Sequence, residues 1–194
     1  MKQQRQMKRT ELLDRRTANR KVYENKDHSK TVEIYLEPVH YQEADGSWKE
    51  MDDTLEEVSE EIMKQADADV KKTSGKAVSV QPDSAAAGQR PGFHNRKGNM
   101  EIFVNHRADD RALVSLKKEG HTLAWGLEAG HPVQAEKQGG SVVLYPEVID
   151  GADLRLRVRG EGVKEDLVLK SPEALMESYT CLYQPGDLRP VPEH

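Results

Sequence analysis

The sequence predicts a mainly β protein, either an antiparallel sandwich or a barrel-like sheet, with one short surface helix and a flexible or disordered insert. Three observations predict this class: short β-branched or aliphatic segments follow one another, Gly, Asp and Asn separate them, and two turn signals mark hairpins. We expect strands at 100–105, 112–117, 121–127, 141–145, 153–159 and 163–170.

An earlier strand is predicted over 31–41, because aliphatic and polar residues alternate there. Val32, Ile34 and Leu36 share one face of such a strand, which we expect to be buried. Pro38 limits the strand to a sheet edge or a bulge.

The next turn signal is Asp45-Gly46, a dipeptide that favours a tight two-residue turn. A turn of this length places Glu43 opposite Trp48 and Tyr41 opposite Glu50. We therefore predict a hairpin over residues 41–51.

The most informative hairpin covers residues 153–170. With Glu161-Gly162 as its turn, Leu156 lies opposite Leu167 and Arg157 opposite Asp166. The same register puts Glu165 on the apolar face beside Val158, where a carboxylate needs a margin position or a cationic partner.

Between the two hairpins the apolar period changes from two to three or four. This spacing, with Thr54 and Glu57 in capping-box positions, predicts a surface helix over 54–70, although so acidic a segment also fits a solvated loop. Residues 71–96 are rich in Ser, Ala, Gly, Pro and Lys and predict a flexible loop. The chain thus divides into a polar lead-in (1–20), one β-rich domain (21–183) and a C-terminal tail (184–194).

Composition argues against several partners. The net charge of −5 gives no global field that would gather nucleic acid, and we expect no nucleic-acid partner. No apolar run approaches the roughly 20 residues that span a bilayer, so no membrane span is expected. Residues 1–20 are too polar for a signal peptide, so if the natural protein is exported we expect this chain to be a fragment of it.

The sequence contains no clear motif for catalysis or metal binding. Paired carboxylates would suit a glycosidase, with Glu165 as the favoured acid, but a structural ion pair is the better interpretation of that residue. The seven histidines lack ligand spacing, and Cys181 alternates with two tyrosines as a packed strand residue would. We therefore predict no catalytic residue, no metal ligand and no cofactor.

A ligand or partner surface is the remaining possibility. Arg155, Arg157 and Arg159 lie on one side of a strand and would suit an anionic glycan or wall polymer, although a solvated face paired with Asp166 is the plainer interpretation. Tryptophans stack on sugar rings, but hairpin or core packing is the better interpretation of both. The candidate surface residues are Trp48, Trp125, Arg155, Arg157, Arg159 and Glu165.

Several stretches resemble a known family. The strings are RTANRKVY (16–23), EPVHY (37–41), DGSWKEMD (45–52), LAWGL (123–127), YPEVIDGADLR (145–155) and GVKEDLVLK (162–170). In order and spacing they resemble the N-terminal β-rich region of wall-associated YD-repeat (Rhs-like) polymorphic toxins and of DNRLRE-domain proteins from Gram-positive bacteria.

That resemblance implies a non-catalytic structural or surface-display module of a larger exported protein, and not an enzyme. Its partners would be other domains of the parent protein, and its location would be secreted or cell-wall-associated. The alternatives are a module that binds cell-wall carbohydrate and a glycan hydrolase.

Overall fold

The computed structural model describes residues 9–58, 92–175, 178–189 and 191. It is mainly β, its sheets are antiparallel, and its helices within these ranges are two 3₁₀ turns, η1 (Leu13–Arg15) and η2 (Pro172–Ala174). Neither turn has the length or apolarity of a membrane-spanning helix. The predicted fold class is therefore confirmed, and the chain divides into two compact units, unit 1 up to Asp52 and unit 2 from Asp53.

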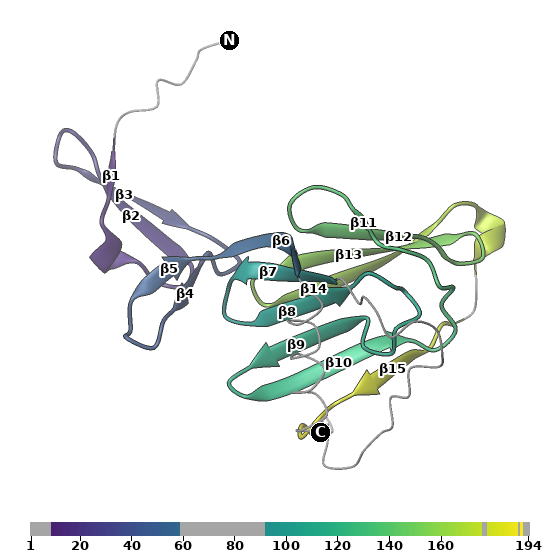
Figure 1. The fold of residues 1–194 in the computed structure, drawn as a ribbon. Helices are drawn as coiled ribbons and strands as arrows, with labels where there is room; N and C mark the ends of the chain where they lie inside the picture. The colour runs from purple at the N-terminus through teal and green to yellow at the C-terminus, as the bar shows by residue number, and fades with distance from the viewer. Residues whose placement is uncertain (1–8, 59–91, 176–177, 190, 192–194) are drawn as a thin grey trace, which may run out of the picture. The chain divides into compact units, whose positions relative to one another are not determined.

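Unit 1 contains a three-stranded sheet and a separate hairpin (Figure 1). Five short strands form these two sheets: β1 (Thr10–Glu11), β2 (Arg20–Glu24), β3 (Lys30–Ile34), β4 (His40–Gln42) and β5 (Trp48–Glu50). The sheet has the order β1-β2-β3, so β2 is its central strand.

Unit 2 contains two larger sheets. The six-stranded sheet has the order β15-β10-β9-β8-β7-β6, and the four-stranded sheet has the order β11-β12-β13-β14. The first comprises β6 (Asp52–Val58), β7 (Gly92–Lys97), β8 (Glu101–Asn105), β9 (Val114–Lys118), β10 (His121–Leu127) and β15 (Cys181–Gln184). The second comprises β11 (Glu136–Lys137), β12 (Val142–Ile149), β13 (Ala152–Arg159) and β14 (Gly162–Leu169).

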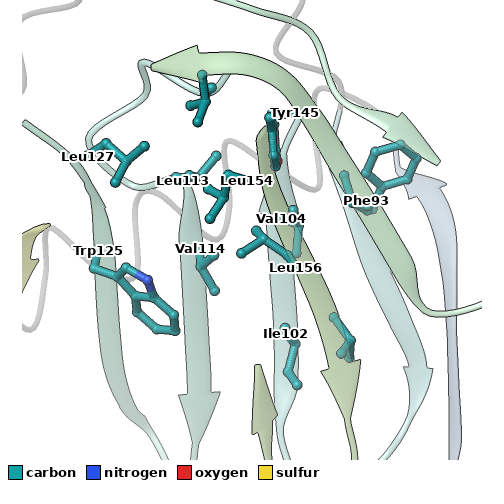
Figure 2. Close-up of a cluster of buried hydrophobic side chains, with 14 of the residues drawn as sticks. Phe93, Ile102, Val104, Leu113, Val114, Trp125, Leu127, Tyr145, Leu154 and Leu156 are labelled. Carbon is teal, nitrogen blue, oxygen red and sulfur yellow. The ribbon is translucent and has the colours of Figure 1, made fainter. Parts of the chain in front are cut away.

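The core of unit 2 lies between these two sheets, as a sandwich requires (Figure 2). Phe93, Ile102 and Val104 come from the six-stranded sheet, and Tyr145 and Leu156 come from the other. Burial alternates along β13, where every second side chain from Ala152 to Val158 is buried. The same alternation leaves the opposite side of β13 to charged residues.

The structure corrects the predicted helix over 54–70. Residues 54–58 belong to strand β6, and the remaining residues of that prediction lie outside the described ranges. Leu55 is fully buried and its N–H donates to the Gly140 carbonyl at 2.8 Å. Tertiary packing therefore determines that this segment is a strand and not a helix. Of the predicted loop 71–96, residues 92–96 lie in strand β7, and the rest is outside the described ranges.

Both predicted hairpins form, but their registers differ from the prediction. In β13–β14, Leu154 pairs with Leu167 and Arg155 with Asp166, because residues 160 and 161 make the turn instead of 161 and 162. This shift of two residues keeps every side chain on its predicted face. In β4–β5, Trp48 pairs with Gln42. The Glu43 N–H donates to the Ser47 carbonyl at 2.9 Å, which leaves a three-residue loop, 44–46, ending in Gly46 with a φ of 84°.

The apolar face predicted for residues 31–41 is not buried. Val32, Ile34 and Leu36 are 52%, 80% and 103% exposed, whereas Glu33 and Tyr35 on the alternate face are partly buried. The periodicity of the strand is therefore right and the choice of its buried face is wrong.

Two histidines of unit 2 rest against phenylalanine rings. His94 stacks on Phe103 and His106 packs against Phe93, each with ring centroids 4.5 Å apart. Each imidazole has a buried Nε2 without a hydrogen-bond partner. Burial lowers the pKa of both histidines, so the folded protein favours their neutral forms.

Acidification below neutral pH is therefore expected to destabilise unit 2. Both pKa values are lower in the folded state than in the unfolded state, so the unfolded chain takes up protons first as the pH falls below about 6.5. Urea unfolding at pH 7.5 and 5.5 measures the loss. In the double variant H94F/H106F this part of the pH dependence should disappear; if it keeps the full dependence, the histidines are not its cause.

Candidate active site

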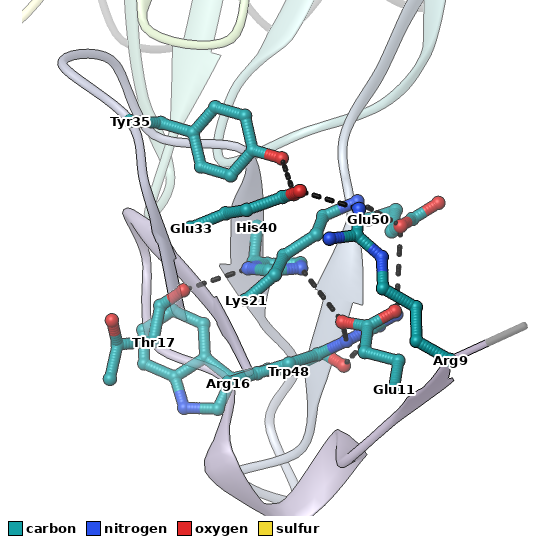
Figure 3. A network of polar contacts seen from close by, with 10 residues as sticks. All are labelled: Arg9, Glu11, Arg16, Thr17, Lys21, Glu33, Tyr35, His40, Trp48 and Glu50. Atoms are coloured by element: carbon teal, nitrogen blue, oxygen red, sulfur yellow. Dashed lines mark hydrogen bonds and ion pairs between the residues drawn. The ribbon is translucent and has the colours of Figure 1, made fainter. Parts of the chain in front are cut away.

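A network of charged side chains covers one face of the unit 1 sheet (Figure 3). Strand alternation explains its position: Lys21 and Tyr23 project from the same side of β2, Glu33 pairs with Lys21, and Glu11 pairs with Tyr23. We call it the Glu11–Glu50 network and define it as Arg9, Glu11, Arg16, Lys21, Glu33, Tyr35, His40 and Glu50.

Arg16 and Glu11 form the centre of the network. The guanidinium Nε and Nη2 donate to the two Glu11 carboxylate oxygens at 2.8 and 2.9 Å, a bidentate arrangement. The side chains are only 10% and 18% exposed. The hydrogen bond from Arg16 lowers the pKa of Glu11 and the same bond raises the pKa of Arg16, so both remain charged near neutral pH.

His40 lies fully buried beside this pair. Its Nδ1 is 2.8 Å from the Thr17 carbonyl, which can only accept, so Nδ1 carries a proton. Its Nε2 has no hydrogen-bond partner and faces Glu11 Oε1 at 4.0 Å. The ring has no access to solvent, and it lies beside Glu11 without a hydrogen bond to it.

Glu50 is the accessible acid of the network, with a side chain 54% exposed. Lys21 donates to Glu50 Oε1, and Arg16 Nη2 lies 3.6 Å from the same oxygen. The hydrogen bond from Lys21 lowers the pKa of Glu50, so this carboxylate is ionised at neutral pH. One exposed carboxylate therefore lies between two cations.

The other end of the network is organised around Glu33. The Tyr35 hydroxyl donates to Glu33 Oε2 at 2.7 Å, and Arg9 forms an ion pair with Oε1. The pKa of Tyr35 rises to about 12 because of Glu33. The Arg9 guanidinium also lies 3.9 Å from the centre of the Tyr23 ring, a cation–π contact that completes this side.

The network places one exposed, ionised carboxylate, Glu50, beside two cations, Lys21 and Arg16, which are paired with Glu50 and Glu11. General base catalysis needs the first, and stabilisation of a charged phosphoryl transition state needs the second. Among the described residues, no three His, Cys, Asp or Glu side chains gather in an arrangement that could hold a metal ion.

The structure disperses the candidate residues taken from the sequence. Trp48 lies in unit 1, where its carbonyl accepts a 3.4 Å hydrogen bond from Arg16, and the others lie in unit 2. There Trp125, 8% exposed, donates its indole N–H to Glu165. Arg155, Arg157 and Arg159 lie on the side of β13 that faces away from the core.

Sequence reasoning missed the network because its members come from the five strands β1 to β5 and from the segments beside them. Glu11 and Arg16 fall within the segment predicted as a polar lead-in, yet Glu11 is in β1. A signal was present: Lys21 and Tyr23, like Glu33 and Tyr35, are two residues apart, the spacing of one strand face. No pattern in the sequence could bring Glu50 to them.

With its sandwich unit and this network, the chain has the features of an antiparallel β protein with a candidate site for acid–base chemistry. No family model and no solved structure matches it. It is similar to the tRNA nuclease WapA of Bacillus subtilis (strain 168) and the tRNA(Glu)-specific nuclease WapA of Bacillus subtilis subsp. natto, each 24% identical over 160 residues. These matches cover 82% of this chain but only 6% of each relative.

These findings correct three expectations. The similarity is to tRNA nucleases, and no family match supports a YD-repeat or DNRLRE protein. Because the relatives are named as enzymes, the expectation of a non-catalytic structural or display module is overturned, and so is the expectation that the protein is not an enzyme. The carbohydrate-binding and glycan hydrolase alternatives find no support in relatives named for tRNA.

Proposed function

We propose that this chain is a β-rich part of a nuclease that acts on tRNA. The observation that carries the proposal is the similarity to WapA tRNA nucleases over 82% of the chain. The chain spans about 6% of the length of those relatives, so their activity and substrate enter here as part of the proposal.

Within the chain, we assign the chemistry to the exposed side of the Glu11–Glu50 network. Glu50 serves as the base that removes the proton of a ribose 2′-hydroxyl, because it is ionised and accessible. The 2′-oxygen bonds to phosphorus, the bond to the 5′-oxygen breaks, and Glu50 returns the proton to that leaving oxygen. Lys21 and Arg16 stabilise the negative charge that develops on the phosphate.

Glu11 and His40 are positioning residues in this arrangement. The bidentate contact from Glu11 fixes the plane of the Arg16 guanidinium, and buried His40 lies beside Glu11. The overall charge of the chain does not gather RNA, so binding depends on local groups such as these. A cell-wall location, based on the same similarity, is part of the proposal.

The substitution E50Q is expected to lower the rate of tRNA cleavage by the full chain at least about 100-fold, the usual contribution of a general base. Cleavage is measured on denaturing gels with labelled tRNA. Glu24 supplies a matched control, because it lies in β2, is 44% exposed, and its carboxylate pairs with His28 and not with a member of the network. E24Q should cleave like the unsubstituted chain.

Two results would contradict this assignment. One is cleavage by E50Q at the unsubstituted rate, and the other is absence of any cleavage by the full chain. Unfolding curves for both variants verify that neither substitution acts through loss of the fold.

A further inference from the structure

The outer side of the four-stranded sheet in unit 2 carries a group of cations that the network does not use. Arg155 and Arg157 project from β13 away from the core, and Lys164 of β14 pairs directly with Arg157. Arg159, which is exposed, continues the same row. We call Arg155, Arg157 and Lys164 the basic row.

The ion pairs on this face do not neutralise the basic row. One carboxylate, Asp166, accepts from Arg155 at 3.1 Å and from Lys164 at 2.7 Å. Arg157 has no acidic partner among the described residues, and its two neighbours across the strands are Lys164 and Val142. The basic row and Asp166 together therefore hold three cations against one acid.

The pairing of Arg157 with Lys164 destabilises the fold unless a bound anion neutralises the two charges. Like charges directly opposite in an antiparallel pair are destabilising. Arg157 and Arg155 are two residues apart on one side of a strand, roughly 6.8 Å by strand geometry, which presents two guanidinium forks in a line. Lys164, 56% exposed, adds a third cation beside them.

We infer that the basic row binds backbone phosphates of the tRNA substrate. The inference rests on the proposed function for the identity of the polyanion, and on the unneutralised cations for the site. Guanidinium forks match phosphate oxygens bidentately, and phosphate contacts position a nucleic acid without reading its sequence. The row is therefore a docking surface and takes no part in cleavage.

The inference is tested by measuring the affinity of the full chain for fluorescein-labelled tRNA at several salt concentrations, with fluorescence anisotropy as the readout. Removing two phosphate contacts in R157Q/K164Q should weaken binding at every salt concentration and lower the slope of log affinity against log salt by about 2. The control K97Q/K118Q removes the same charge from exposed positions on β7 and β9 and should leave that slope unchanged.

An equal loss in both double variants, or no loss in R157Q/K164Q, would overturn the inference. Displacement of the labelled tRNA by polyglutamate as effectively as by unlabelled tRNA would also overturn it, because the row would then take any polyanion. Failure of the proposed function is separate: it is seen as absence of tRNA cleavage, whichever way the binding assay turns out.

Discussion

Replacing Gly126 by alanine is expected to destabilise unit 2 by about 3 kcal/mol, at the upper end of the cost of inserting a methyl group into a packed interior. A Cβ at this position would overlap the Asp110 carbonyl oxygen and lie 2.7 Å from the Arg111 carbonyl oxygen. These are backbone atoms, so the clash is relieved only by moving a strand or the loop. Urea unfolding of the variant measures the loss.

Gly140 provides the control for this substitution. An alanine Cβ there would have its nearest neighbour, Thr54 Oγ1, at 3.8 Å, which is ordinary contact. G140A should unfold like the unsubstituted chain. If G126A is as stable as the unsubstituted chain, β10 does not approach residues 110–111 as closely as the structure shows.

Replacing Trp125 by alanine is expected to cost about 3–5 kcal/mol, the usual range for loss of a large aromatic side chain from a core. Trp125 belongs to β10 of one sheet and donates its indole N–H to Glu165 in β14 of the other. The substitution therefore removes buried apolar area and also leaves a partly buried carboxylate without its donor.

Tyr183 supplies the comparison for Trp125, since its ring lies 6.2 Å away but is 65% exposed. Y183A should cost below about 1 kcal/mol, as substitutions at exposed positions usually do. A loss below about 1 kcal/mol for W125A would show that Trp125 and Glu165 do not join the two sheets.

Local periodicity predicted the sandwich and most of its strands. The strand expected at 121–127 is β10, and the alternating residues of 153–159 divide between core and surface as expected. Periodicity succeeds here because each strand has one face against a continuous core and one face outside it. Residues 54–58 show the opposite case, in which burial of Leu55 overrides an apparent helical spacing.

Hairpin registers and the candidate site depend on information that the sequence does not carry locally. The string Asp45-Gly46 fits loops of two or three residues, and the loop length determines which residues of β4 and β5 pair across the hairpin. Glu165 was expected either at the margin of the sheet or beside a cation. It lies on the edge strand β14 and accepts from a tryptophan N–H of the other sheet. The contacts of Glu11 with Arg16 and of Lys21 with Glu50 likewise depend on how strands pair.

The exposed side of β3 shows why alternation alone cannot assign a buried face. Val32 and Ile34 have the pattern of core residues, yet the ionic side of this sheet is the one that is partly buried. Paired charges can occupy a shielded face when every carboxylate has a donor, as Glu11 and Glu33 do.

Cleavage of a tRNA with one 2′-deoxyribose at the scissile nucleotide tests most directly whether this chain cuts RNA through the Glu50 chemistry. Without a 2′-hydroxyl there is no proton for Glu50 to remove and no oxygen to attack phosphorus. We expect the full chain to cut the all-ribose tRNA and to leave the substituted tRNA intact at that position. Cutting of both substrates at the same rate would contradict the mechanism.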